Sequence, residues 1–133
     1  MIATRTRILL ADDNPVLLET VAKHLGPQFD IVGAVTNGVE LVDEALRLNP
    51  DLIIADITMP NMNGIDAASK LRELGCATKL VYLTVHSEPE FVKACLAQGA
   101  LGYVLKARMK GHLLAAIQAA LDGQVYISPL HFR

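Results

Sequence analysis

Four short stretches of this chain are apolar at every position, and few folds can accept such a pattern. They are Ile8–Ala11, Leu52–Ala55, Leu80–Leu83 and Tyr103–Leu105. A strand with one face in water alternates apolar and polar residues, so an unbroken run predicts a strand that is covered on both faces. A fifth, weaker candidate strand is Asp30–Val35. These runs predict a mostly buried, parallel sheet.

Segments in which apolar residues recur at helical spacing separate the predicted strands. The recurring residues are Leu18, Val21 and Leu25; Leu41, Ala45 and Leu48; Ala68, Leu71 and Leu74; Phe91 and Cys95; and Leu114, Ile117 and Leu121. Three of the helices carry start signals, namely Asn14 before Pro15, Asn63 before Gly64, and a capping box over 87–90. Strict alternation of strand and helix predicts right-handed crossovers, and therefore one α/β domain with helices on both faces of a five-stranded parallel sheet.

Composition and charge exclude several classes of protein. The longest apolar run, Leu113–Ile117, has five residues, whereas a membrane span needs about 18. We expect no membrane association and, without a signal sequence, a cytoplasmic protein. Cys76 and Cys95 predict no disulfide framework. With a net charge of -2 and no basic cluster, this chain alone is not expected to bind DNA.

Polar residues follow four of the predicted strands directly. Asp12 and Asp13 come after the first strand, Asp56 after the third, Thr84 after the fourth and Lys106 after the fifth. In an open parallel sheet the ligand crevice lies beyond the carboxyl ends of the strands. We therefore expect these side chains to form one site.

The residue types at these positions suit phosphoryl chemistry. Carboxylates within about 5 Å of one another repel by roughly 3 kcal/mol per pair, and a hard divalent cation relieves this repulsion. No His or Cys stands at these strand ends, which favours Mg2+ over zinc. Lys106 and Thr84 can bind phosphoryl oxygens. Asp56, alone at the end of its strand, is the candidate nucleophile, and Asp12 and Asp13 are the candidate metal seat.

Taken together, these positions resemble the receiver domain of two-component response regulators, the CheY-like family, over nearly the whole chain. The residues that carry the resemblance are Asp12, Asp13, Asp56, Met59, Pro60, Gly64, Thr84 and the stretch Gly102–Lys106. The end of the chain resembles regulators of the NarL/FixJ type. The resemblance implies a flavodoxin-like sheet with strand order 2-1-3-4-5.

The family resemblance also assigns roles at the acidic residues. It implies that Asp56 accepts a phosphoryl group from a sensor histidine kinase. It implies that Mg2+ is bound by Asp13, Asp56 and the backbone carbonyl of Thr58, while Asp12 acts mainly through a bound water. The chain would then be a regulatory domain that takes part in its own phosphorylation and dephosphorylation, and not an enzyme.

A conformational switch is implied as well. Thr84 and Lys106 would contact the phosphoryl oxygens, and Thr84 would move toward the phosphate so that Tyr103 can rotate inward. The output surface would be the fourth helix, the fifth strand and the fifth helix, with a possible homodimer on phosphorylation.

Three residues near the site depart from common receiver patterns or have an open role. Many receivers have a cis proline after the lysine, whereas this chain has Ala107, for which we expect a trans bond. Val85 is bulkier than is common after the switch threonine. His86 stands, like Thr58, at a position that tunes dephosphorylation in the family, and it is either such a residue or a loop histidine without a role.

The resemblance divides the chain into a receiver domain over 1–123 and a tail, or the start of a linker, over 124–133. In NarL/FixJ-type transcription regulators an output domain follows, and DNA would be bound only through that domain. The chain is either a receiver excised from such a regulator or a stand-alone receiver.

Three other functions use a related fold or site. A receiver that works as a protein-binding module without phosphorylation stays open. A flavodoxin-like electron carrier is disfavoured because Asp12 and Asp13 would repel its phosphate. A haloacid dehalogenase-type phosphohydrolase is disfavoured because Thr58 stands where a second acid is needed.

Overall fold

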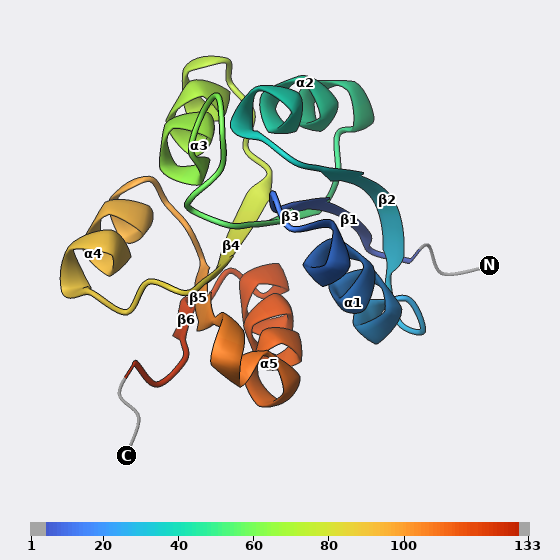
Figure 1. Cartoon of the computed structure of the whole chain (residues 1–133). Helices are drawn as coiled ribbons and strands as arrows, with labels where there is room; N and C mark the ends of the chain where they lie inside the picture. Colours follow the sequence, from blue (N-terminus) through green and yellow to red (C-terminus); the bar gives the residue numbers. More distant parts are fainter. Residues whose placement is uncertain (1–4, 131–133) are drawn as a thin grey trace.

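The structure is a computed structural model that describes residues 5–130. Strands and helices alternate along the chain, as predicted (Figure 1). The strands are β1 (Arg7–Ala11), β2 (Asp30–Val35), β3 (Leu52–Ala55), β4 (Lys79–Thr84), β5 (Gly102–Leu105) and β6 (Tyr126–Ile127). The helices are α1 (Pro15–Leu25), α2 (Gly38–Leu48), α3 (Gly64–Glu73), α4 (Pro89–Ala97), the 3-10 turn η1 (Lys106–Arg108) and α5 (Met109–Leu121).

All strand pairs in the sheet are parallel, and the strand order is β2-β1-β3-β4-β5-β6. The order of the first five strands confirms the expected α/β architecture. The sixth strand is an addition, because Tyr126 pairs with Gly102 at the edge of β5. Residues 124–130 of the expected tail thus include a sheet strand, and 131–133 lie outside the described residues.

Helices cover both faces of the sheet (Figure 1), with α1 and α5 on one face and α2, α3 and α4 on the other. Successive strand residues point to opposite faces. Accordingly, Ile8 and Leu10 join the core beneath α1 and α5, and Leu9 and Ala11 join the core beneath the other three helices. Burial on both faces is the reason why the strand sequences are apolar without interruption.

Two of the three predicted helix starts are confirmed. The side chains of Asn14 and Asn63 accept hydrogen bonds from amides in the first turns of α1 and α3. The predicted capping box at Ser87 is wrong. Glu88 is the N-cap of α4 and makes no side-chain capping bond. Pro89 suits the first helical position, so the N-cap falls on the residue before it and Ser87 lies outside the helix.

Three further features bear on smaller expectations. The cysteines Cys76 and Cys95 are both free thiols, and burial raises the pKa of the Cys95 thiol to about 12. The peptide bond before Ala107 is trans, as expected, since residues 5–130 contain no cis bond. No helix in that range combines the length and the apolar character that crossing a bilayer requires.

Candidate functional site

Three aspartates meet at the carboxyl edge of the sheet, where the sequence predicted a shared site. Asp12 and Asp13 follow β1, and Asp56 follows the adjacent strand β3. One carboxylate oxygen from each lies within 4.8 Å of the others. Asp12 and Asp56 are only 4% and 5% exposed, while Asp13 is exposed. We call these three residues the acidic cluster.

Lys106, at the end of β5, completes the cluster from the other side. Its ammonium donates to Asp12 Oδ2 at 2.8 Å and to Asp56 Oδ2 at 3.0 Å. One ammonium against the three carboxylates of the acidic cluster leaves two negative charges uncompensated. The cluster can therefore accept a cation, and its oxygen ligands suit a hard divalent ion.

Burial and ion pairing shift the pKa values of Asp12 and Lys106 in opposite directions. Burial raises the pKa of the Asp12 carboxyl, although the hydrogen bond from Lys106 opposes this shift. For Lys106, burial disfavours the charged ammonium, but the hydrogen bonds to Asp12 and Asp56 outweigh it and raise the pKa. The lysine is thus held firmly in its charged form, while the buried Asp12 carboxylate is stabilised less well.

The backbone around Asp56 fixes the orientation of its carboxylate. The Asp56 amide donates to the carbonyl of Ala11 at 2.9 Å, and the Ile57 amide donates to Asp56 Oδ1 at 2.7 Å. The following loop turns back so closely that a Cβ on Gly64 would lie 2.1 Å from the Asp56 carbonyl oxygen. Only glycine fits there without displacing backbone, which is why Gly64 belongs to the site.

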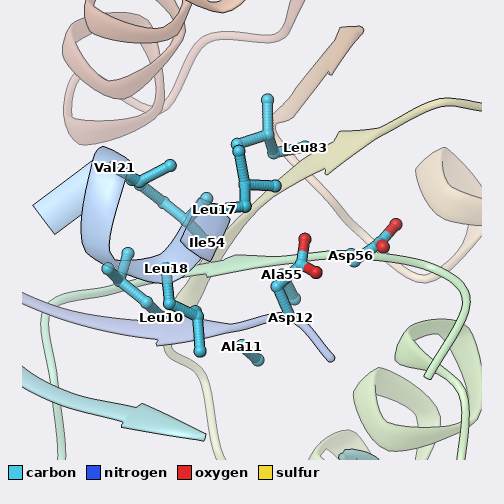
Figure 2. Close-up of a pocket in the computed structure, with 10 residues that line it drawn as sticks. All are labelled: Leu10, Ala11, Asp12, Leu17, Leu18, Val21, Ile54, Ala55, Asp56 and Leu83. Atoms are coloured by element: carbon cyan, nitrogen blue, oxygen red, sulfur yellow. The ribbon is translucent and has the colours of Figure 1, made fainter. Parts of the chain in front are cut away.

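A small cavity lies directly beneath the two buried aspartates, between α1 and the sheet (Figure 2). Its volume of about 10 Å³ is enough for at most one water molecule. Its other lining residues are apolar: Leu10, Ala11, Leu17, Leu18, Val21, Ile54, Ala55 and Leu83. The acidic cluster therefore has an apolar floor, which accounts for the strong effect of burial on Asp12.

His86, whose role the sequence leaves open, contacts several of the residues around the site. Its Nε2 lies 2.8 Å from Thr58 Oγ1, and its ring stacks on Phe91 at a centroid distance of 4.3 Å. Its amide donates to Thr84 Oγ1 at 3.3 Å, and its carbonyl accepts from the Tyr103 hydroxyl at 2.7 Å. His86 thus contacts Thr58 in the loop after β3 and the two predicted switch residues, Thr84 and Tyr103.

The predicted switch residues Thr84 and Tyr103 are both fully buried. Burial raises the pKa of the Tyr103 phenol, so it stays a neutral donor. Within residues 5–130 the Thr84 hydroxyl is hydrogen-bonded to the His86 amide and not to the acidic cluster. The structure therefore brings Asp12, Asp13, Asp56 and Lys106 together and joins Thr84 to the loop that follows it.

Comparison of sequences places the chain in a family. The sequence model of the family described as "Response regulator receiver domain" matches residues 8–118. The nitrate/nitrite response regulator protein NarL of Escherichia coli (strain K12) is 37% identical over 123 residues, which cover 91% of this chain and 57% of that protein. The transcriptional regulatory protein DegU of Brevibacillus brevis is 32% identical, over 94% of this chain and 54% of that protein. The chain thus spans little more than half the length of these curated relatives.

Solved structures agree with the sequence comparison. The signal receiver domain of the putative response regulator NarL from Mycobacterium tuberculosis superposes with a TM-score of 0.86 at 27% identity, covering 92% of this chain and 100% of that one. A LuxR-family two-component response regulator from Aurantimonas sp. SI85-9A1 gives a TM-score of 0.89 at 29% identity, over 95% of this chain and 91% of that one. The chain belongs to the receiver domains of two-component response regulators, and the relatives that it matches include regulators of the NarL type.

Proposed function

We propose that this chain is a phosphorylation-dependent switch in which Asp56 accepts a phosphoryl group from the phosphohistidine of a sensor histidine kinase. The observation that carries the proposal is the position of Asp56, a 5% exposed carboxylate held by the Lys106 ammonium at 3.0 Å beside two further aspartates. A nucleophile in such a setting is oriented before the donor arrives, and phosphoryl transfer depends mainly on positioning and charge neutralisation.

The transfer step uses the phosphohistidine donor, side chains of this chain and the cation. An Asp56 carboxylate oxygen attacks phosphorus, the bond from phosphorus to the donor nitrogen breaks, and the departing imidazole keeps the electron pair and takes up a proton from water. Lys106 then exchanges its bond to Asp56 Oδ2 for a bond to a phosphoryl oxygen. Thr84 can do the same after releasing the His86 amide.

The acidic cluster fits Mg2+ by its donor chemistry, because it offers carboxylate oxygens only and carries two uncompensated negative charges. Asp13 and Asp56 would hold the ion with the backbone carbonyl of Thr58, and Asp12 would act through a bound water. When bound, the ion neutralises charge on the phosphoryl oxygens. The residues of the chain orient the nucleophile and surround the cavity beneath it with apolar side chains.

Phosphorylation would then act on the surface formed by α4, β5 and α5. Thr84 would move toward the phosphoryl group, and the ring of Tyr103, which is already buried without it, would be held in that inward position, so that an equilibrium between two arrangements shifts. The altered surface would favour a homodimer and, in a full-length transcription regulator, control an output domain that binds DNA.

A second function has one observation in its favour. Val85 directly follows Thr84 in the chain, and its branched side chain is 69% exposed. A bulky residue there can slow the approach of a phosphodonor. In that case the chain, stand-alone or within a longer protein, would bind its partner without phosphorylation.

Intact-protein mass spectrometry after incubation with Mg2+ and a small acyl-phosphate donor distinguishes the two functions. We expect the mass of one phosphoryl group on the wild type and on Asp43→Asn, a control at an exposed position of α2. The adduct should be absent from Asp56→Asn. An unmodified wild type, or an adduct that persists in Asp56→Asn, would contradict the proposal.

A further inference from the structure

The segment 124–130, which we call the tail, lies along the outer edge of β5 (Figure 1). The amide of Tyr126 donates to the carbonyl of Leu101 at 2.9 Å, and the amide of Ser128 donates to the carbonyl of Tyr103 at 2.8 Å. The tail therefore continues the parallel ladder of the sheet by two rungs and is bound to the backbone of β5.

A third rung comes from a side chain. The amide of Leu105, the last residue of β5, donates to Ser128 Oγ at 3.0 Å. Ser128 is 1% exposed, so no water can replace its hydroxyl without movement of the tail. The residue that follows Leu105 is Lys106, whose ammonium binds the acidic cluster.

Side chains hold the tail on both sides of the sheet. Tyr126 packs against the core beneath α1 and α5, and its hydroxyl contacts Nδ1 of His112 on α5. Leu130 packs against the core on the opposite face. The tail is thus a docked element of the domain, although it follows the last helix.

The residues of β5 that hold the tail are those that lead into the site. Tyr103 binds the tail through its carbonyl, while its hydroxyl donates to the carbonyl of His86 next to the switch threonine. Leu105 binds the tail and directly precedes Lys106. A rearrangement that shifts the backbone of β5 at Tyr103 or Leu105 would therefore change the geometry of the tail rungs.

We propose that docking of the tail and occupation of Asp56 by a phosphoryl group favour each other. This inference rests on the proposed function. The tail binds the amide of Leu105, and the next residue, Lys106, carries the ammonium that would bind a phosphoryl oxygen on Asp56. If binding of the phosphoryl group by Lys106 strengthens the tail rungs, linkage requires that the docked tail in turn raise the affinity of the site for the phosphoryl group.

Titration with beryllofluoride in the presence of Mg2+ tests this coupling on the full chain. Ser128→Ala removes the acceptor of the Leu105 amide, and Tyr126→Phe removes only a hydroxyl while its ring keeps the packing. We expect each to weaken beryllofluoride binding by about fivefold, the lower end of typical coupling factors. The matched control Ser69→Ala, on α3 and away from the tail, should bind as the wild type does.

Amide hydrogen exchange supplies a second readout that a purely structural tail would not produce. We expect the amides of Tyr126, Ser128 and Leu105 to exchange more slowly in the wild type once beryllofluoride is bound. Wild-type affinity in both variants, together with unchanged exchange at these amides, would overturn the coupling and leave the proposed function standing. A wild type that fails to bind beryllofluoride would overturn both.

Discussion

Replacing Lys106 by methionine removes the one ammonium that pairs with the acidic cluster among residues 5–130, while keeping a long unbranched side chain. The ammonium lies 2.8 Å from an Asp12 oxygen and 3.0 Å from an Asp56 oxygen. At an effective dielectric constant of about 20, these two attractions amount to about 6 and about 5.5 kcal/mol. The cost of burying the lysine offsets much of this sum, because its side chain is 19% exposed.

What decides the outcome is the state of the two aspartates after the substitution. Their carboxylates would remain buried, close together and without a cation. We therefore expect Lys106→Met to lower the free energy of unfolding by about 3 to 5 kcal/mol at neutral pH without divalent cations, the usual cost of removing one partner of a buried ion pair. Added Mg2+ should restore more stability to Lys106→Met than it adds to the wild type, since it replaces the lost positive charge.

Urea unfolding at pH 7, in EDTA and again in Mg2+, measures both effects. Lys110→Met is the matched control, because Lys110 is an exposed lysine at the start of α5 and should change stability by no more than about 0.5 kcal/mol. A loss of less than about 1 kcal/mol in Lys106→Met, or an equal response of both variants to Mg2+, would show that the ion pairs do not stabilise the site as argued.

Three further substitutions test separate features of the site. Burial raises the pKa of Asp12 above 3.8, so the protonated carboxyl stabilises the fold; this contribution is complete below pH 3.8 and is lost as the pH rises through the raised pKa. Without divalent cations, Asp12→Asn, which carries no charge at any pH, should therefore raise the midpoint of urea unfolding at pH 7. A gain in the midpoint that does not shrink toward pH 4 would refute this. His86→Ala should shorten the lifetime of the acyl phosphate on Asp56 several-fold by opening the loop to water, and equal decay rates would dispose of that role. Gly64→Ala should cost about 2 kcal/mol or more, since its Cβ would lie 2.1 Å from backbone oxygen, whereas Gly111→Ala, which meets nothing within 4 Å, should not destabilise the fold.

The central strands and their ends could be predicted because a strand that is buried on both faces is apolar at every position. The run Ile8–Ala11 has no polar member, and Asp12 marks the point at which the strand leaves the core. The same argument located Asp56 and Lys106. The order of the strands, by contrast, came only from the family resemblance, because periodicity does not reveal which strands are neighbours.

The features that the sequence did not reveal depend on contacts between distant segments or on very short elements. Strand β6 has two residues, too few for a periodic pattern, and exists because the edge of β5 offers it partners. The contact between His86 and Thr58 joins loops 28 positions apart. The prediction of Ser87 as an N-cap was wrong because Pro89, two positions later, is the first residue of α4, which makes Glu88 the N-cap.

The acidic cluster and its lysine are supplied by three strands that are synthesised at different times. Lys106 lies 50 positions after Asp56, and β1, β3 and β5 must all be in the sheet before the site exists. A nascent chain on the ribosome therefore carries the aspartates long before it can present a competent acceptor. Under the proposed function, competence to accept a phosphoryl group would coincide with completion of the fold, so that a partly made or misfolded copy would take none from a kinase.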